Sequence, residues 1–149
     1  MVAHISRART LGADPQTIWD VLADFGTIST WADGVEHSCL LRAAAEPVGL
    51  TRRVQMGGIV LTERIIEFDH PGALAYDIEG LPSFAGRVRN RWDLHPLSEQ
   101  STEVSLTTSV DIGSRLPRRL VERLVCQVSG KMSDGLLTGL ARHLEDAHG

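Results

Sequence analysis

Two titratable side chains on predicted strands, His37 and Glu63, are the residues best suited to chemistry. A histidine titrates near neutral pH, so it can move a proton or hold a carboxylate or a carbonyl group. A buried carboxylate has a raised pKa and can act as an acid or anchor a water molecule. Each residue also has a plainer interpretation, as a half-hydrated histidine at a strand edge and as a surface glutamate paired with an arginine. No local rule brings the two together.

The position of Glu63 depends on which face of its strand is buried. Glu63 shares a face with Leu61 and Ile65, because side chains alternate along a strand. Ile66 and Phe68 lie on the opposite face. Only one of these sets can face the interior unless a bulge intervenes. We take the Glu63 face as the inner one, and the alternation alone leaves the choice open.

A third group of candidates consists of Tyr76, Asn90 and Trp92. Tyr76 lies between Leu74 and Ile78 on the apolar face of its strand. Asn90 is the polar member of an otherwise apolar inward series, and a buried amide needs a hydrogen-bonding partner. A ligand, a water molecule or neighbouring side chains can supply that partner. For Tyr76 and Trp92, packing in the core is the favoured role.

Other polar residues favour no specific site. Arginines cluster on one predicted strand and at the start of the last helix, which is typical of solvated surface; a docking site for an anionic partner or a membrane is the alternative. The six histidines show no metal-ligand spacing, and there is no phosphate-binding, dinucleotide-binding or acyl-transfer motif. We therefore expect no metal and no cofactor.

The elements that must position these residues follow from periodicity and turn signals. Asp14 and Pro15 predict the start of a short helix, and residues 25–31 predict a second one. Hydrophobic alternation, bounded by glycine and proline, predicts strands near residues 2–10, 37–41, 50–56, 59–68, 74–78, 88–94 and 104–112. This order is typical of an α+β fold in which an antiparallel sheet wraps one long helix.

The last third of the chain, residues 114–148, predicts that long helix, with Ser114 as its N-cap. Apolar residues recur at steps of four, at Leu116, Leu120, Leu124, Val128, Met132, Leu136, Leu140 and Leu144. Steps of four overshoot the helical period by about 40° each, so the stripe drifts. Gly130, Gly135 and Gly139 lie where the drift accumulates, and each costs about 1 kcal/mol relative to alanine. We expect a bend over residues 129–139, above either a closely packed sheet or a cavity.

Composition limits the class of protein. The chain has 149 residues, a net charge of −4 and 42% hydrophobic residues, which suits one domain over residues 1–149 and argues against bulk nucleic-acid binding. No apolar run is long enough to span a membrane, and residues 1–10 lack a signal-peptide core. Cys39 and Cys126 are too few for a disulfide framework. We therefore expect a cytoplasmic protein without stable membrane insertion, either a monomer or a homodimer.

Several short motifs, in this order and spacing, resemble a known family. They are Asp14-Pro15 with Ile18-Trp19, then Trp31, residues 48–54 (VGLTRRV), residues 62–65 (TERI), residues 69–71 (DHP) and Leu74-x-Tyr76-x-Ile78. Together they are similar to the START/Bet v 1 superfamily (SRPBCC), in particular its polyketide cyclase/dehydrase-like branch. The resemblance covers nearly the whole chain. It implies a helix-grip fold: a seven-stranded antiparallel sheet around a long C-terminal helix, with two short helices after the first strand.

The resemblance also implies a hydrophobic cavity between sheet and helix. Relatives place a pocket-facing cation near His37 and point a glutamate inward near Glu63. The expected ligand-binding residues are His37, Val54, Met56, Glu63, Tyr76, Ile78, Val88, Asn90, Trp92, Leu106, Val128, Met132 and Leu136. We expect this cavity to hold a small hydrophobic molecule such as a lipid or a polyketide.

Three functions remain open at this stage. The first is a carrier or binding protein whose polar groups orient the ligand. The second is an enzyme of the polyketide cyclase/dehydratase type, with His37 and Glu63 as base and acid. The third is an interaction protein with a collapsed cavity. Because the sequence lacks a clear acid–base pair, we favour the binding protein.

Overall fold

The computed structural model describes residues 2–42, 45–81, 86–111 and 117–148. At residues 42, 118, 120–122, 124–129 and 147–148 it describes the backbone and not the side chain. The predicted N-cap Ser114 and the predicted helical residue Leu116 lie outside the described residues.

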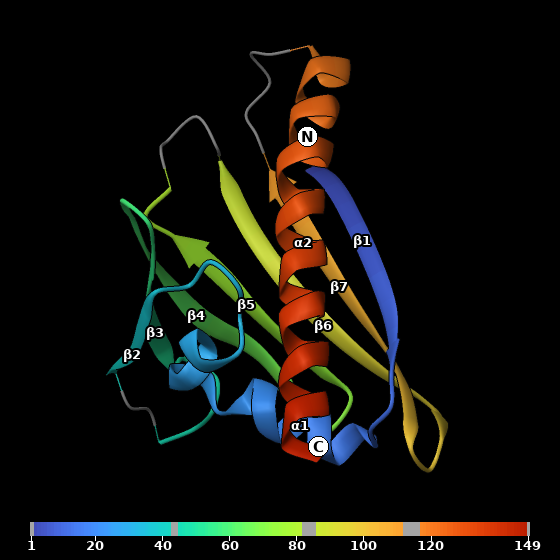
Figure 1. Ribbon diagram of the computed structural model, residues 1–149. Coiled ribbons are helices and arrows are strands. Elements are labelled where there is room, and N and C mark those ends of the chain that lie inside the picture. The colour runs from blue at the N-terminus through green and yellow to red at the C-terminus, as the bar shows by residue number, and fades with distance from the viewer. Residues whose placement is uncertain (1, 43–44, 82–85, 112–116, 149) are drawn as a thin grey trace.

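Seven antiparallel strands form one sheet in the order β1-β7-β6-β5-β4-β3-β2. The strands are β1 (Val2–Leu11), β2 (His37–Arg42), β3 (Thr51–Met56), β4 (Ile59–Asp69), β5 (Ala73–Glu79), β6 (Arg87–Ser98) and β7 (Ser101–Asp111). The helices are α1 (Pro15–Ala23), the 3-10 helix η1 (Phe25–Thr30) and α2 (Arg118–His148). Figure 1 shows α2 running along one face of the sheet, with α1 beside its C-terminal end. This is the predicted helix-grip α+β fold.

The two short helices form much as the sequence predicts. Asp14 occupies the N-cap of α1 and Pro15 the first helical position, where its missing N–H is not needed. The Asp14 carboxylate caps no backbone N–H and instead accepts a hydrogen bond from the Thr17 hydroxyl. The second helix is a 3-10 helix with a kink at Thr27. Its Phe25 is buried in the core, and its ring packs against that of Tyr76 on β5.

Antiparallel register determines which side chains share the face of the sheet that α2 covers, here called the inner face. Glu63 on β4 is opposite Arg52 on β3 and Ile78 on β5. Two residues along, Ile65 is opposite Tyr76. Directly opposed residues point to the same side of a sheet, so all five lie on the inner face.

A bulge in β4 answers the question of strand parity. The register shifts between Ile65 and Glu67. Before the shift, Glu63 and Ile65 are buried on the inner face. After the shift, Phe68 lies on the same face. Its ring packs edge-on against Trp19 of α1, with 4.9 Å between the ring centroids. The Glu63 face is therefore the inner one, as we expected. The bulge lets Phe68 face the interior as well.

One apolar core fills the space between the inner face, α1, η1 and the C-terminal half of α2. Trp31, at the end of η1, packs edge-on against Trp92 of β6, with 6.0 Å between ring centroids. Among the described side chains of α2, those buried in this core are Leu137, Leu140, Ala141 and Leu144, and Leu136 packs against it. A smaller cluster on the inner face contains Ile5 and Val110, with Val88 against it.

The glycines of α2 allow close approach rather than bending. α2 is one unbroken helix, and Figure 1 shows no kink in it, so the bend expected over residues 129–139 is not observed. A Cβ atom at Gly139 would collide with the backbone carbonyl oxygen of Trp31. A Cβ atom at Gly130 would lie 2.9 Å from Nη2 of Arg7 on β1. Two of the three glycines thus bring α2 against η1 and β1.

Candidate functional site

Six hydrogen-bonding side chains meet on the inner face and form what we call the inner polar cluster. Each of the strands from β3 to β7 contributes at least one member. The members are Arg52, Glu63, Tyr76, Asn90, Trp92 and Thr108, and all six are buried. A polar group in such a place is costly unless it is paired, so the cluster is either fully satisfied or aimed at a ligand.

Arg52 and Glu63 form a buried ion pair. Nε of Arg52 donates to Oε1 of Glu63 at 2.8 Å, and Nη2 lies 2.7 Å from the same oxygen. The remaining nitrogen, Nη1, donates to the backbone carbonyl of Phe25 at 3.0 Å. Every nitrogen of the guanidinium group therefore has a partner.

Aromatic rings enclose the Arg52 cation. The central guanidinium carbon lies 3.7 Å from the centroid of the Phe25 ring and 4.8 Å from that of Tyr76. Both distances are within the range of a cation–π contact, which is stronger when the cation is desolvated. Arg52 thus connects β3, β4 and η1 and serves as a structural centre of the cluster.

The second half of the cluster is built around the Tyr76 hydroxyl. Its oxygen accepts from the Trp92 indole N–H at 3.3 Å and from the Asn90 side-chain amide at 3.4 Å. Thr108 donates to Oδ1 of Asn90 at 2.7 Å, which orients the amide group. With two donors directed at its oxygen, Tyr76 has its hydroxyl hydrogen left for an acceptor. No described residue takes that hydrogen in this arrangement.

Tyr76 is a hydrogen-bond donor and not a base. Burial raises the pKa of its phenol above the ordinary value of 10.0, and the Glu63 carboxylate raises that pKa further. The charge of Arg52 and the hydrogen bonds from Trp92 and Asn90 oppose part of this rise. The phenol consequently stays protonated at neutral pH and can hold a carbonyl or hydroxyl oxygen.

Most predicted site residues lie on the inner face. Fully buried there are Val54, Glu63, Tyr76, Asn90, Trp92 and Leu106. Partly buried against the cores are Met56, Ile78, Val88 and Leu136. Their contact with a ligand stays a prediction. Val128 has no described side chain.

The prediction that His37 faces the interior is wrong. His37 is exposed at the start of the edge strand β2, opposite Gln55. The next residue, Ser38, is opposite the buried Val54 and donates to the backbone carbonyl of Gly26 at 2.8 Å. Ser38 therefore faces in and His37 faces out. The structure does not bring His37 to Glu63.

Met132 is 44% exposed and does not belong to the described core, so its contact with a ligand stays a prediction. Steps of four residues overshoot the helical period by about 40° each, so Met132 is rotated away from the partly buried Leu136 and further from the buried Leu140. Leu137, one residue beyond the predicted Leu136, lies in the core instead, together with Leu140.

Sequence reasoning missed Arg52 and Thr108. The sequence did contain a signal for Arg52. It lies two residues before Val54 and four before Met56, so it shares the strand face of these two residues, which we did place on the inner face. Its charge would ordinarily assign it to solvent. Thr108 shares the inner parity of Leu106 and Val110 on β7, but threonine is common on either face of a strand.

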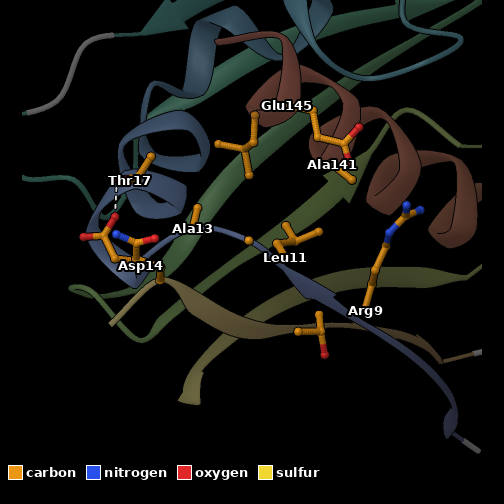
Figure 2. A pocket seen from close by; sticks show the side chains of 11 residues that line it. Arg9, Leu11, Ala13, Asp14, Thr17, Ala141 and Glu145 are labelled. Atoms are coloured by element: carbon orange, nitrogen blue, oxygen red, sulfur yellow. Dashed lines mark hydrogen bonds between the residues drawn. The ribbon is translucent and has the colours of Figure 1, made fainter. Parts of the chain in front are cut away.

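A separate surface pocket of 640 Å³ lies where β1 ends, α1 begins and α2 ends (Figure 2). Its apolar lining residues are Leu11, Ala13, Ala141 and Leu144. Figure 2 shows the hydrogen bond between Thr17 and Asp14 at one end, with Arg9 and Glu145 farther along. None of its polar lining side chains is buried. We therefore take the inner polar cluster, and not this pocket, as the candidate site.

The described residues provide neither a metal-binding cluster nor a membrane-spanning helix. They contain no group of three or more histidine, cysteine, aspartate or glutamate side chains placed to hold a metal ion. No helix in the described part of the chain is long and apolar enough to cross a membrane.

Comparison with known proteins identifies the family. Residues 2–145 match the family model described as polyketide cyclase / dehydrase and lipid transport. The chain belongs to this family. The predicted resemblance to the START/Bet v 1 superfamily is thereby confirmed. No curated protein sequence matches the chain significantly.

Solved structures similar to this member of the family show the same fold. The Zhui aromatase/cyclase from Streptomyces sp. R1128 has a TM-score of 0.80 at 18% identity, covering 97% of this chain and 94% of that one. A START superfamily protein from Mycobacterium smegmatis has a TM-score of 0.77 at 16% identity, covering 97% and 98%. The di-domain ARO/CYC StfQ from the steffimycin biosynthetic pathway has a TM-score of 0.79 at 10% identity, covering 99% of this chain and 52% of its own length. At these identities the likeness concerns the fold alone.

Proposed function

We propose that the protein binds a small, mostly apolar molecule between the inner face of the sheet and α2, as a carrier or binding protein. The observation that carries the proposal is the inner polar cluster, a set of buried hydrogen-bonding groups within an apolar face. Binding sites for small molecules combine apolar walls with a few placed polar groups in this way. Membership of a family that includes lipid transport supports the same function.

Two atoms of the cluster have capacity for a ligand. Both hydrogen bonds of the Arg52–Glu63 pair use Oε1, and no described group bonds Oε2 of Glu63. The second group is the Tyr76 hydroxyl hydrogen, for which no described side chain is the acceptor. A ligand whose polar end reaches these two atoms keeps its apolar body against Ile78 and Val88, which are partly buried on the same face.

The alternative is an enzyme that uses His37 as base and Glu63 as acid, and the positions of these two side chains do not support it. General acid–base catalysis needs both groups within hydrogen-bond reach of one substrate. His37 is exposed on the outer face, and Glu63 is tied to Arg52 on the inner face. Binding without chemistry is the function that the remaining groups support.

Titration with a neutral fluorescent probe, a dansyl-labelled undecanol, tests the proposal. We expect saturable one-to-one binding to the wild-type protein. Val88→Trp places a large ring on the inner face and should weaken binding at least about tenfold, or 1.4 kcal/mol. The matched control is Arg87→Trp, because Arg87 is the exposed neighbour on the same strand, and it should leave the affinity unchanged. Absence of saturable binding, or equal effects of the two substitutions, would contradict the proposal.

A further inference from the structure

Charge on the buried part of the inner face is balanced. Among the described residues, Arg52 and Glu63 are the two charged residues that are buried, at 2% and 6% exposure. They neutralise each other at 2.7 Å. A ligand that enters beside them therefore meets no net charge.

Arg52 has little left to offer an anionic ligand. Its Nε and Nη2 face Glu63, its Nη1 is bonded to the Phe25 carbonyl, and aromatic rings lie against its plane. A carboxylate brought to this place would have to displace Glu63 or lie beside it. Removing a carboxylate from water without a compensating partner is costly, so either arrangement disfavours binding.

Among the described strand residues, the other two cations on the inner face are Arg7 and Arg9 of β1, and both contact α2. Arg7 lies 3.6 Å from Asp134 and is 45% exposed in its side chain. Arg9 is exposed and donates to the Thr138 hydroxyl at 3.3 Å. Arg7 is opposite Leu106 and Arg9 is opposite Val104, and the described contacts of both side chains are with α2 and not with the inner polar cluster.

The free atoms of the cluster suit a hydroxyl group instead. Oε2 of Glu63 can accept a hydrogen bond, and the Tyr76 hydroxyl can donate one. A hydroxyl group on a ligand both donates and accepts, so it can pair with either of these atoms without adding charge.

On the basis of the proposed function, we infer that the site selects neutral, hydroxyl-bearing apolar ligands over carboxylates, and that Glu63 determines this selectivity by neutralising Arg52. The inference goes beyond the binding of an apolar molecule, because it names the polar end of the ligand and the residue that excludes the alternative.

Two matched probes test the inference, dansyl-labelled undecanol and the corresponding dansyl-labelled undecanoic acid at neutral pH. The wild-type protein should bind the alcohol at least about tenfold more tightly than the acid. Glu63→Gln keeps the shape of the side chain and leaves the positive charge of Arg52 without its ion-pair partner. This variant should gain at least about tenfold in affinity for the acid.

The double variant Arg52→Gln/Glu63→Gln is the control, because it removes both charges and should show no gain for the acid. Circular dichroism checks that each variant is folded. If Glu63→Gln does not fold, the ratio of the wild-type affinities for the alcohol and the acid still tests the selectivity. Equal wild-type affinities would overturn the inference and leave the proposed function standing, whereas no binding of either probe would overturn the proposed function itself. A gain in the double variant equal to that of Glu63→Gln would show that Arg52 is not the cause.

Discussion

Nε of Arg52 donates to Oε1 of Glu63 at 2.8 Å, and both side chains are buried on the inner face. Arg52→Ala leaves the Glu63 charge without its partner, and we expect it to lower the free energy of unfolding by about 3–5 kcal/mol. Arg53 is the neighbour on the opposite face of the same strand, and Arg53→Ala should change that free energy by no more than about 0.5 kcal/mol. Urea denaturation measures both. Equal losses would show that the pair does not stabilise the fold.

Alkaline titration tests the environment of Tyr76, which is the single tyrosine of the chain. Its pKa is raised in the folded protein, first by burial and then by Glu63, above the ordinary value of 10.0 that applies after unfolding. A raised pKa contributes stability that is complete below the unfolded value and is lost as pH rises through the folded value. We therefore expect no phenolate absorbance in the native protein near pH 10.0 and a loss of stability above it. Phenolate absorbance that appears near this pH while the circular dichroism stays native would contradict the burial of the hydroxyl.

Two glycines of α2 should respond in opposite ways to alanine. At Gly139 a Cβ atom would meet the Trp31 carbonyl, which is backbone and cannot move easily, so Gly139→Ala should destabilise by about 1–3 kcal/mol. At Gly135 no atom lies within 4 Å of such a Cβ, and Gly135→Ala should stabilise by about 0.5–1 kcal/mol through helix propensity. Thermal unfolding of the two variants gives the comparison. Stabilisation by both would mean that α2 does not pack closely against Trp31.

The fold was largely predictable because each element carries its own local signal. Asp14-Pro15 defines the start of α1, and the alternating segments of β5, β6 and β7 lie close to their predicted positions. Glycine at 139 illustrates the limit of such reasoning. A bend and a close contact both favour glycine, and only the position of Trp31 distinguishes them.

The site was predictable only in part because it depends on strand parity. β2 reads His-Ser-Cys-Leu-Leu-Arg, in which Leu40 and Leu41 are adjacent, so alternation does not decide which face His37 takes. β4 contains a bulge that no residue type announces. Arg52 was missed because a charged residue is ordinarily assigned to solvent, whereas here it is buried with Glu63, Phe25 and Tyr76 around it.

His37→Ala should leave ligand affinity unchanged, because His37 is exposed on the outer face. Asn90→Ala removes a donor to Tyr76 and the acceptor of Thr108, and we expect it to weaken binding of dansyl-labelled undecanol by about 1–3 kcal/mol. Fluorescence titration of the two variants side by side makes the comparison. If His37→Ala lowered the affinity as much as Asn90→Ala does, His37 would have to be part of the binding site.

Heteronuclear NMR of the protein during titration with dansyl-labelled undecanol tests the location of the site most directly. The three tryptophan indole N–H groups and the Asn90 side-chain amide each give a separate probe. We expect the resonances of the Trp92 indole and the Asn90 amide to shift in proportion to occupancy, because both donate to Tyr76 inside the inner polar cluster. Shifts confined to the outer face of the sheet, or to the pocket beside Leu11 and Leu144, would contradict a binding site between the sheet and α2.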